Sequence, residues 1–403
     1  MRLLATLHDP WMALCFAHAL GDELAGVLTY GESDFAERFA ALGVRAVLVP
    51  PALEATTLGL LGDASGAAFV AEEPSRLLCF KPSRRLEERA AALGAVLALA
   101  PASLAQRLEN KLVLAELAAD AGIPTAPTDV VALPAQAKTT VRADTAFAAL
   151  QALVHTDGPV VVQAPRGFMG RKTWQVADAA HWAALRPDLV RRPTKVTRFV
   201  DGRPGTLNAV VDHAGTVLCT APIVQVTGEP LLTPYPLGSC GNDFTWRCAP
   251  DPRTGPYELA RRLGVALAAR GYRGHFGIDF VVDSERTWLI EINPRLTASM
   301  ALYSAFRPLL ARAHLRALDG EDLRSTGELP PLDAGQLIVH NLGDAPVTPL
   351  APRAEPLGGH ALPSRAAPRL VWPSITSEVA PGATRGRRVR VGAVVAAEGA
   401  VLF

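Results

Sequence analysis

The sequence predicts an α/β protein in which an N-terminal doubly wound parallel-sheet domain precedes a two-lobed α+β domain and a small β-rich C-terminal segment. Two observations lead to this prediction. Up to about residue 100, short apolar runs alternate with helical patterns, which is typical of a parallel sheet with helices on its faces. From about residue 330 the composition shifts to Pro, Ala, Gly and Arg. We place the three parts at 1–103, 104–330 and 331–403.

The N-terminal part contains several strand-like runs, from RLLATL at residues 2–7 to AVLALA at residues 95–100. Segments with helical spacing, such as residues 35–43 and 83–94, lie between them. No GxGxxG turn is present, so we assign no dinucleotide to this part. We expect it to be an accessory or substrate-side domain.

The middle part begins with a helix predicted over Leu104–Ala121, which Gly122 caps and Pro124 stops. A small lobe at about 124–200 follows, with a strand, a glycine-containing loop and another strand. The second lobe spans about 201–330 and contains further strands joined by glycine turns. We therefore expect two lobes of mixed α and β structure after the parallel sheet.

Within the second lobe, a helix is predicted from about Pro256 to Arg270. Residues 221–246 are rich in glycine, proline and polar side chains, and we expect a loop there. Its polar residues include Gln225, Thr227, Ser239, Asn242 and Asp243. Such a loop could hold an acceptor substrate or lie at the surface, and the sequence favours neither alternative.

Charge and composition exclude several classes of protein. Forty Lys and Arg residues against 39 Asp and Glu residues leave a net charge near zero, which argues against nucleic acid or an anionic membrane as a partner. The five cysteines contain no CxxC pair, which argues against a disulfide framework and a zinc ribbon. No apolar run is long enough for a signal peptide core or a membrane span. We expect a soluble cytoplasmic protein with small-molecule partners.

The segments 277–282 and 288–293 predict an antiparallel hairpin that carries acids among apolar residues. A turn centred on Glu285 places Asp279 directly across from Glu291. Asn293 then lies on the same face as Glu291, because side chains alternate along a strand. Opposed buried carboxylates repel unless cations hold them ionised, and such oxygen ligands suit Mg²⁺ or Mn²⁺ together with nucleotide phosphates. Pairing of the acids with Arg or Lys is an equally weighted alternative.

The stretch GIDFVVDSERTWLIEINPR at 277–295 resembles the metal-binding hairpin of the ATP-grasp superfamily, which includes biotin carboxylase and carbamoyl phosphate synthetase. The likeness covers roughly residues 105–310. It implies Mg²⁺ ligands at three positions: Asp279, Glu291 and Asn293. It further implies that Arg295, whose guanidinium suits bidentate contacts with oxygen anions, stabilises the transferred phosphoryl group or an acyl phosphate.

The same resemblance assigns a nucleotide site. Lys111 is implied to reach the phosphates of ATP, and the segment 165–173 is similar to a glycine-containing loop that folds over them. Gly167 and Gly170 would let backbone N–H groups approach phosphate oxygens. The basic residues of that loop would supply positive charge; they are Arg166, Arg171 and Lys172.

Two positions depart from the family's pattern. Gln163 stands where the strand before the loop usually carries a lysine, so one phosphate contact is expected to weaken or to move to Arg166 or Lys172. The linker that contacts adenine lacks its usual glutamate, and Thr197 lies in that stretch instead. We expect Gln163 and the groups around Phe199 and Val200 to complete the ATP site.

The resemblance implies an ATP-dependent ligase that activates a carboxylate as an acyl phosphate and joins it to an amine, with amino-acid-like substrates and Mg²⁺ as cofactor. The expected partners are these small molecules, and we expect neither nucleic acid nor a membrane to be a partner. A homodimer is compatible with the resemblance. Three alternatives stay open: a nucleotide-binding protein of the same fold without ligase activity, a carboxylase-type member acting on a separate carrier, and a scaffold with purely structural acids. Metal-dependent stabilisation by ATP would exclude the last.

Overall fold

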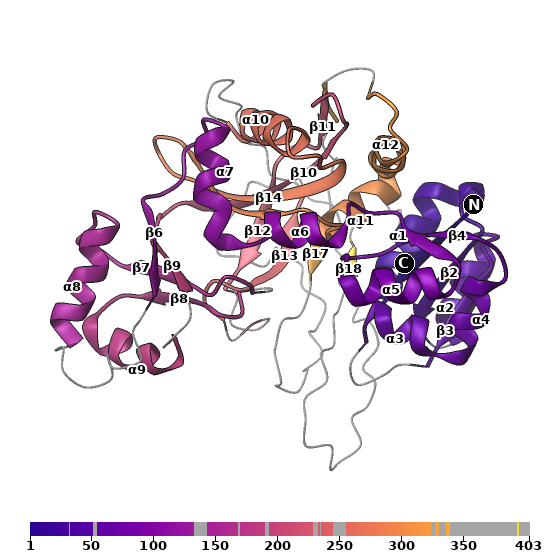
Figure 1. Ribbon diagram of the computed structural model, residues 1–403, viewed down its shortest axis with the longest axis horizontal. Helices are drawn as coiled ribbons and strands as arrows, with labels where there is room; N and C mark the ends of the chain where they lie inside the picture. The colour runs from indigo at the N-terminus through magenta and orange to yellow at the C-terminus, as the bar shows by residue number, and fades with distance from the viewer. Residues whose placement is uncertain are drawn as a thin grey trace, which may run out of the picture.

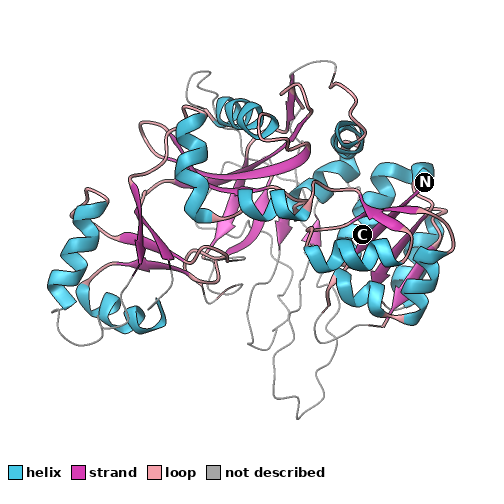
Figure 2. Cartoon of the chain, viewed as in Figure 1, coloured by secondary structure: helices cyan, strands magenta, loops and turns pink. Residues whose placement is uncertain are grey.

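The computed structural model describes residues 1–31, 33–50, 55–132, 143–167, 170–189, 193–228, 233, 235–244, 255–323, 327–329, 336–338 and 393–394. These residues form three β-sheets with helices packed around them (Figure 1, Figure 2). The large sheet lies between the N-terminal sheet and a small sheet at the other end of the molecule (Figure 1). The predicted fold class is confirmed.

The N-terminal sheet is parallel, with strand order β3-β2-β1-β4-β5. Its strands are β1 (Arg2–Leu7), β2 (Gly26–Tyr30), β3 (Ala46–Val49), β4 (Ser75–Leu78) and β5 (Ala95–Leu97). The helices are α1 (Pro10–Leu20), α2 (Ser33–Ala41), α3 (Thr57–Gly62), α4 (Ala64–Ala71) and α5 (Arg84–Ala92), with a 3₁₀ turn at Gly21–Glu23. Helix α1 contacts α2, and α3 contacts α5. This is the doubly wound arrangement that the alternating pattern predicts.

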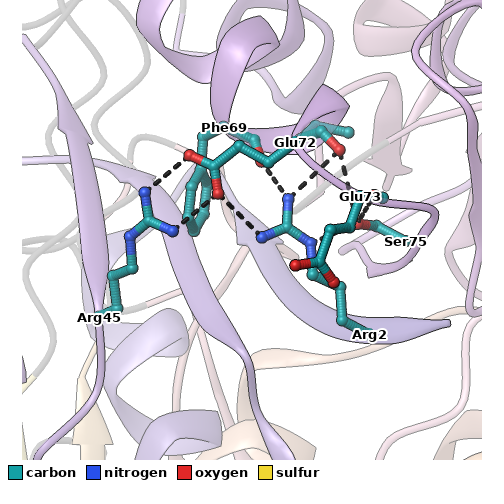
Figure 3. A network of polar contacts seen from close by, with 7 residues as sticks. Arg2, Arg45, Phe69, Glu72, Glu73 and Ser75 are labelled. Carbon is teal, nitrogen blue, oxygen red and sulfur yellow. Dashed lines mark hydrogen bonds and ion pairs between the residues drawn. The ribbon is translucent and has the colours of Figure 1, made fainter.

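An exposed ion cluster ties the rim of this sheet together (Figure 3). The carboxylate of Glu72, just beyond α4, receives both terminal nitrogens of Arg45 at 2.7 Å. It also pairs with Arg2 at the start of β1, at 3.1 Å. Both guanidinium groups lie over the ring of Phe69. Because Arg45 and Glu72 are solvent-exposed and the cluster lies in a different sheet from the acid hairpin, we assign it a structural role.

The helix predicted over Leu104–Ala121 is interrupted, and this prediction is wrong in that respect. Helix α6 covers Ala102–Leu108, a 3₁₀ turn (η2) follows at Lys111–Val113, and α7 covers Leu114–Asp120. Asn110 is extended and its side chain caps Leu112 N–H at 3.1 Å, which restarts the helix in a new direction. Gly122 follows α7 with φ +64°, as its predicted capping role requires.

The small sheet is antiparallel with strand order β6-β9-β7-β8. Its elements are β6 (Thr128–Ala132), α8 (Ala143–Leu153), β7 (Val160–Gln163), β8 (Thr173–Val176), α9 (Ala179–Leu189) and β9 (Pro193–Arg198). A separate apolar core, centred on Phe147 and Trp182, packs the two helices against one face of this sheet. The other face is therefore left for the cavity described below, and the predicted strand–loop–strand of the small lobe is present.

In the part of the chain that the structure describes, the large sheet has nine strands, most of them in the order β15-β14-β10-β12-β13-β17-β18. They are β10 (Arg203–Val211), β11 (Val217–Cys219), β12 (Ile223–Thr227), β13 (Ser239–Asp243), β14 (Gly274–Val282), β15 (Thr287–Asn293), β16 (Gly327–Glu328), β17 (Gln336–Ile338) and β18 (Ala393–Val394). Its helices are α10 (Pro256–Ala268), α11 (Ala298–Phe306) and α12 (Leu309–Leu318). Helix α10 matches the predicted helix closely.

One expectation about this part needs correction. Much of the polar segment 221–246 is not a loop, because β12 and β13 form an antiparallel pair inside the large sheet. Strands β17 and β18, the described part of the predicted β-rich C-terminal segment, extend the same sheet. The rest of that segment lies outside the described residues.

Helices α1 and α11 pack against each other and join the N-terminal sheet to the large one. One continuous apolar core runs through both, with Phe16, Leu302 and Tyr303 among its buried members. This shared core fixes the first βα turn of the N-terminal sheet beside the β14–β15 hairpin. Within the described residues, no helix is both long and apolar enough to cross a membrane.

Candidate active site

A cavity of about 310 Å³ lies where the three sheets meet. Its lining brings together nearly all residues that the sequence analysis assigned to the site: Lys111, Gln163, Gly167, Gly170, Phe199, Val200, Asp279, Glu291, Asn293 and Arg295. Lys172 is exposed on the β7–β8 turn and is not among the described lining residues. Sequence positions far apart thus converge on one space.

The β14–β15 hairpin places two acids face to face, in the register that the sequence predicted, with Asp279 opposite Glu291. The route to that register differs from the prediction. The turn is one residue tighter, so that Val282 pairs with Thr287, and a β-bulge at Ile290 then shifts the pairing by one residue. Without the bulge, Ile290 would face Asp279 and Glu291 would leave the cavity side.

Asp279 is held by two amide groups. Gln225 on β12 donates to one carboxylate oxygen at 3.2 Å, and Asn293 on β15 donates to the other at 3.1 Å. Burial, together with the nearby charge of Glu291, raises the pKa of Asp279 to about 6. The carboxylate is therefore poised for a cation that would lower its pKa again.

Glu291 forms an ion pair with Lys111, which is buried on the 3₁₀ turn η2. The backbone of Lys111 is fixed as well, because its N–H donates to Pro165 O at 3.1 Å. The interruption of the predicted helix at Glu109 and Asn110 turns Lys111 inward in this way. A regular helix through this segment would direct the lysine differently.

The acid pair fits a hard divalent cation that is shared with a ligand. The two carboxylates and the amide of Asn293 offer oxygen donors, which Mg²⁺ and Mn²⁺ prefer. No group of three or more His, Cys, Asp or Glu residues capable of holding a metal occurs among the described residues. A cation here would thus need further oxygens from water or from nucleotide phosphates, which is how Mg²⁺ is commonly bound.

Arg295 follows the hairpin and is held on several sides. Its guanidinium donates to Glu109 at 3.0 Å and to the side-chain oxygen of Asn293 at 2.8 Å, and it lies 4.8 Å from the ring centre of Phe80. Burial raises the pKa of Glu109, but Arg295 and Lys81 outweigh burial and leave that pKa below its usual value. The ionised Glu109 therefore holds the guanidinium of Arg295 in place at the cavity wall.

A buried polar network supports Arg295 from behind. The ring of His275 contacts Arg295 O at 2.7 Å and Asn208 Oδ1 at 3.2 Å. Thr297 donates to the same Asn208 oxygen at 2.6 Å. Burial lowers the pKa of His275 to about 3, so the ring is neutral near pH 7. The network fixes the chain just after the hairpin without adding charge.

The loop between β7 and β8 reaches the segment 235–238 that precedes β13. Gly170 has φ +77°, and a Cβ there would lie 2.4 Å from Gly238 Cα, so only glycine fits this approach. The guanidinium of Arg171 lies 5.9 Å from the ring centre of Tyr235. The described parts of the two segments therefore cover one side of the cavity; Phe168 and Met169 lie outside the described residues.

Another part of the cavity suits a flat ring. It is lined by residues of the small sheet and the hairpin: Thr128, Val161, Thr197, Arg198, Phe199, Val200, Val281 and Leu289. Phe199 N–H is already bound, since it donates to Pro159 O at 3.1 Å. The apolar walls offer stacking surface for such a ring.

Sequence reasoning missed Lys195, a buried lysine that lines the cavity. It lies on β9 directly opposite Gln163 on β7. Its Nζ donates to Ile290 O at 3.4 Å. Burial and the nearby Lys111 lower the pKa of Lys195 to about 7, against the opposing effect of Glu291. Only the pairing of two distant strands reveals this residue; the local sequence carries no signal for it.

The far end of the cavity belongs to the N-terminal sheet and was also missed. Asp9 follows β1 and Phe80 follows β4, so both lie at the carboxyl edge where the chain order of the sheet reverses. Doubly wound sheets bind ligands at this edge. The helices α1 and α11 line the space beside them with Trp11, Met12, Cys15, Ala298, Ala301 and Leu302. Burial raises the pKa of the Cys15 thiol, so it is no nucleophile.

Comparison with known proteins agrees with this geometry. Residues 158–299 match the family model described as an ATP-grasp domain, in agreement with the resemblance seen in the sequence. No curated protein matches the chain in sequence.

Solved structures with the same fold are numerous. Phosphoribosylamine–glycine ligase from Thermotoga maritima is 14% identical, with a TM-score of 0.62 over 99% of this chain and 93% of its own. Biotin carboxylase from Campylobacter jejuni, in complex with an ATP ligand, is 13% identical, with a TM-score of 0.60 over 84% and 75%. N5-carboxyaminoimidazole synthetase from Staphylococcus aureus, complexed with ADP, is 12% identical, with a TM-score of 0.54 over 84% and 82%. At these identities the likeness establishes the fold.

Proposed function

We propose that the protein is an ATP-dependent ligase that activates a carboxylate as an acyl phosphate and joins it to an amine; the match of residues 158–299 to an ATP-grasp family model supports this. One observation carries the proposal. A single cavity holds two opposed acids of the large sheet, a buried lysine from the small sheet, a second buried lysine from the turn η2 and a fixed arginine just beyond β15. That distribution of charge suits a metal-bound triphosphate lying between the sheets.

Asp279, Glu291 and Asn293 are the residues we assign to Mg²⁺, with Mn²⁺ as a substitute. Bound there with ATP, the cation would neutralise charge on the phosphates. Gln225 supports this assignment, because it orients Asp279 through a hydrogen bond at 3.2 Å. Lys111, now paired with Glu291, lies close enough to the acids to contact the phosphates as well.

The reaction needs no nucleophile from the protein. An oxygen of the substrate carboxylate attacks the γ-phosphorus, the bond to the β–γ bridging oxygen breaks, and ADP leaves with the electron pair. The amine then attacks the acyl carbon, phosphate leaves with the bridging oxygen, and the nitrogen loses a proton. The protein contributes by positioning the reactants and by stabilising charge.

We assign Arg295 to the charge that develops on the transferred phosphoryl group and on the acyl phosphate. Its contacts with Glu109 and Asn293 hold the guanidinium in place before substrate binds, which reduces the cost of reorganisation. The loop that contains Gly167 and Gly170 is assigned to cover the phosphates and exclude water. Water would otherwise hydrolyse the acyl phosphate.

The space between α1 and α11 is our candidate for the substrates. Its apolar lining suits an apolar side group, while Arg295 at its border suits a carboxylate and Asp9 suits a cationic amine. We therefore favour amino-acid-like substrates with apolar side chains over strongly charged ones.

A panel of carboxylate and amine pairs, with Mg-ATP, tests the proposed function through ADP release. We expect ADP to form when a suitable carboxylate and amine are both present, and pairs with apolar side chains to be the best substrates. Bicarbonate is included as a carboxylate of its own. ADP release with bicarbonate alone would indicate a carboxylase, and ATP binding without ADP release across the panel would favour a nucleotide-binding protein.

A further inference from the structure

We infer that Lys195 binds the nucleotide phosphates from the side of the cavity opposite the acid hairpin, taking the place that Gln163 leaves without a charge. The inference rests on the proposed function and names a residue for it that the sequence pattern did not indicate. It replaces the expectation that Arg166 or Lys172 would supply the missing phosphate contact.

The first observation is the pairing of strands β7 and β9. Residues 163 and 195 are direct partners in the antiparallel pair of β7 and β9, so both side chains emerge on the same face of the small sheet. Both line the cavity, and both are buried. A lysine at either position therefore delivers its ammonium group to the same space. Arg166 and Lys172 are exposed, and neither is among the described lining residues.

The second observation is the charge of the groups around Lys195. Among the described residues, no carboxylate forms an ion pair with its ammonium group, and its one hydrogen bond is to Ile290 O. Glu291, the nearest acid to influence it, is already paired with Lys111. A buried ammonium group without a neighbouring anion is unfavourable. An anionic ligand bound next to Lys195 would therefore explain why this lysine is buried.

The third step is geometric. Ile290, whose carbonyl oxygen receives the hydrogen bond from Lys195, is the bulged residue beside Glu291. Lys195 therefore reaches from the small sheet to the edge of the acid hairpin. Lys195 from the small sheet, Lys111 from the turn η2 and two acids from the hairpin bound the same volume. A triphosphate with its metal carries charges of both signs and matches this arrangement.

Binding of ATP, ADP and adenosine to the intact protein, in the presence of Mg²⁺, tests the inference by titration calorimetry. For Lys195→Gln we expect the Kd of ATP and ADP to rise about tenfold to hundredfold, the effect of losing one charge-assisted contact. The Kd of adenosine, which has no phosphates, should change less than about twofold and also shows that the variant is folded. Arg84→Gln removes one positive charge from an exposed site on α5 and serves as a control.

The double variant Gln163→Lys/Lys195→Gln exchanges the two side chains. We expect it to recover most of the lost affinity for ATP and ADP. Unchanged ATP and ADP binding in Lys195→Gln, or an equal loss for adenosine, would overturn the inference, as would an exchange that recovers nothing. A protein that turns over ATP normally but fails this test would retain the proposed function, whereas failure of the unmodified protein to bind ATP would remove both.

Discussion

The two sides of the cavity differ in charge and in the way they are assembled. The β14–β15 hairpin contributes Asp279 and Glu291 from one continuous stretch of chain. The opposite side contributes Lys195 from β9 and Lys111 from η2, which are brought together only by tertiary structure. Burial shifts the pKa of Asp279 up and that of Lys195 down, so each side is unfavourable by itself. A ligand with charges of both signs, such as the metal-bound triphosphate that we propose, would complement the two sides.

Neutralising the acid side should have the largest effect. Asp279→Asn and Glu291→Gln should each lower the rate of ADP formation roughly 10²–10³-fold, because a group that stabilises charge in the transition state is lost. Glu285→Gln, at the exposed turn of the same hairpin, is the matched control and should leave the rate unchanged. ADP formation at the wild-type rate in both acid variants would contradict the role that we assign to the acid side of the cavity.

The cationic side should reveal itself in the pH dependence of stability. The folded pKa of Lys195 is about 7 and its unfolded value is 10.5, so between these values the unfolded chain binds the extra proton. Wild-type stability from this group therefore rises with pH across that window, by about 1.4 kcal/mol per pH unit. Lys195→Met lacks the penalty of burying the charge.

Urea unfolding of the ligand-free protein at pH 7 and pH 9 measures this effect. The stability advantage of Lys195→Met over wild type should be larger at pH 7 than at pH 9, by roughly 2–3 kcal/mol. Taking the difference between the two proteins cancels the titration of groups that they share. An advantage that grows with pH would show that Lys195 is stabilised by its surroundings and needs no anion.

The smallest effect is expected at the loop that covers the cavity. Gly170→Ala should raise the Kd of ATP about threefold to tenfold, because a Cβ would collide with the backbone at Gly238. Gly43→Ala is the matched control, since Gly43 has a similar φ of +70° but nothing within 4 Å of the added carbon. It should cost about 1 kcal/mol of stability and leave ATP binding unchanged. Equal ATP binding in both variants would show that the contact with Gly238 does not matter.

The acid hairpin was predictable because its partners are close in sequence and alternate with apolar residues. Even so, the opposition of Asp279 and Glu291 was predicted from a turn one residue longer than the real one, without the bulge at Ile290. The two deviations cancel at these positions. Local patterns thus predicted which two acids face each other, although they could not specify the bulge that keeps both side chains on the cavity side.

The remaining residues depend on long-range pairing, which one sequence does not display. Lys195 faces Gln163 only because β9 pairs with β7, and Gln225 reaches Asp279 only because β12 lies in the same sheet. The helix is interrupted before Lys111 because the side chain of Asn110 caps the next turn. The prediction followed the helical periodicity of the segment and gave no weight to this cap. The parallel N-terminal sheet was predicted well, since its alternating strands and helices are a repeated local pattern.

Oxygen transfer tests the central claim most directly. With a substrate carboxylate labelled with ¹⁸O at both positions, ATP, Mg²⁺ and the amine, the account predicts that one labelled oxygen appears in the released phosphate. That oxygen must cross to phosphorus if an acyl phosphate forms. If the released phosphate carried no label and both labelled oxygens were found in other products, this result would contradict activation of the carboxylate by phosphorylation.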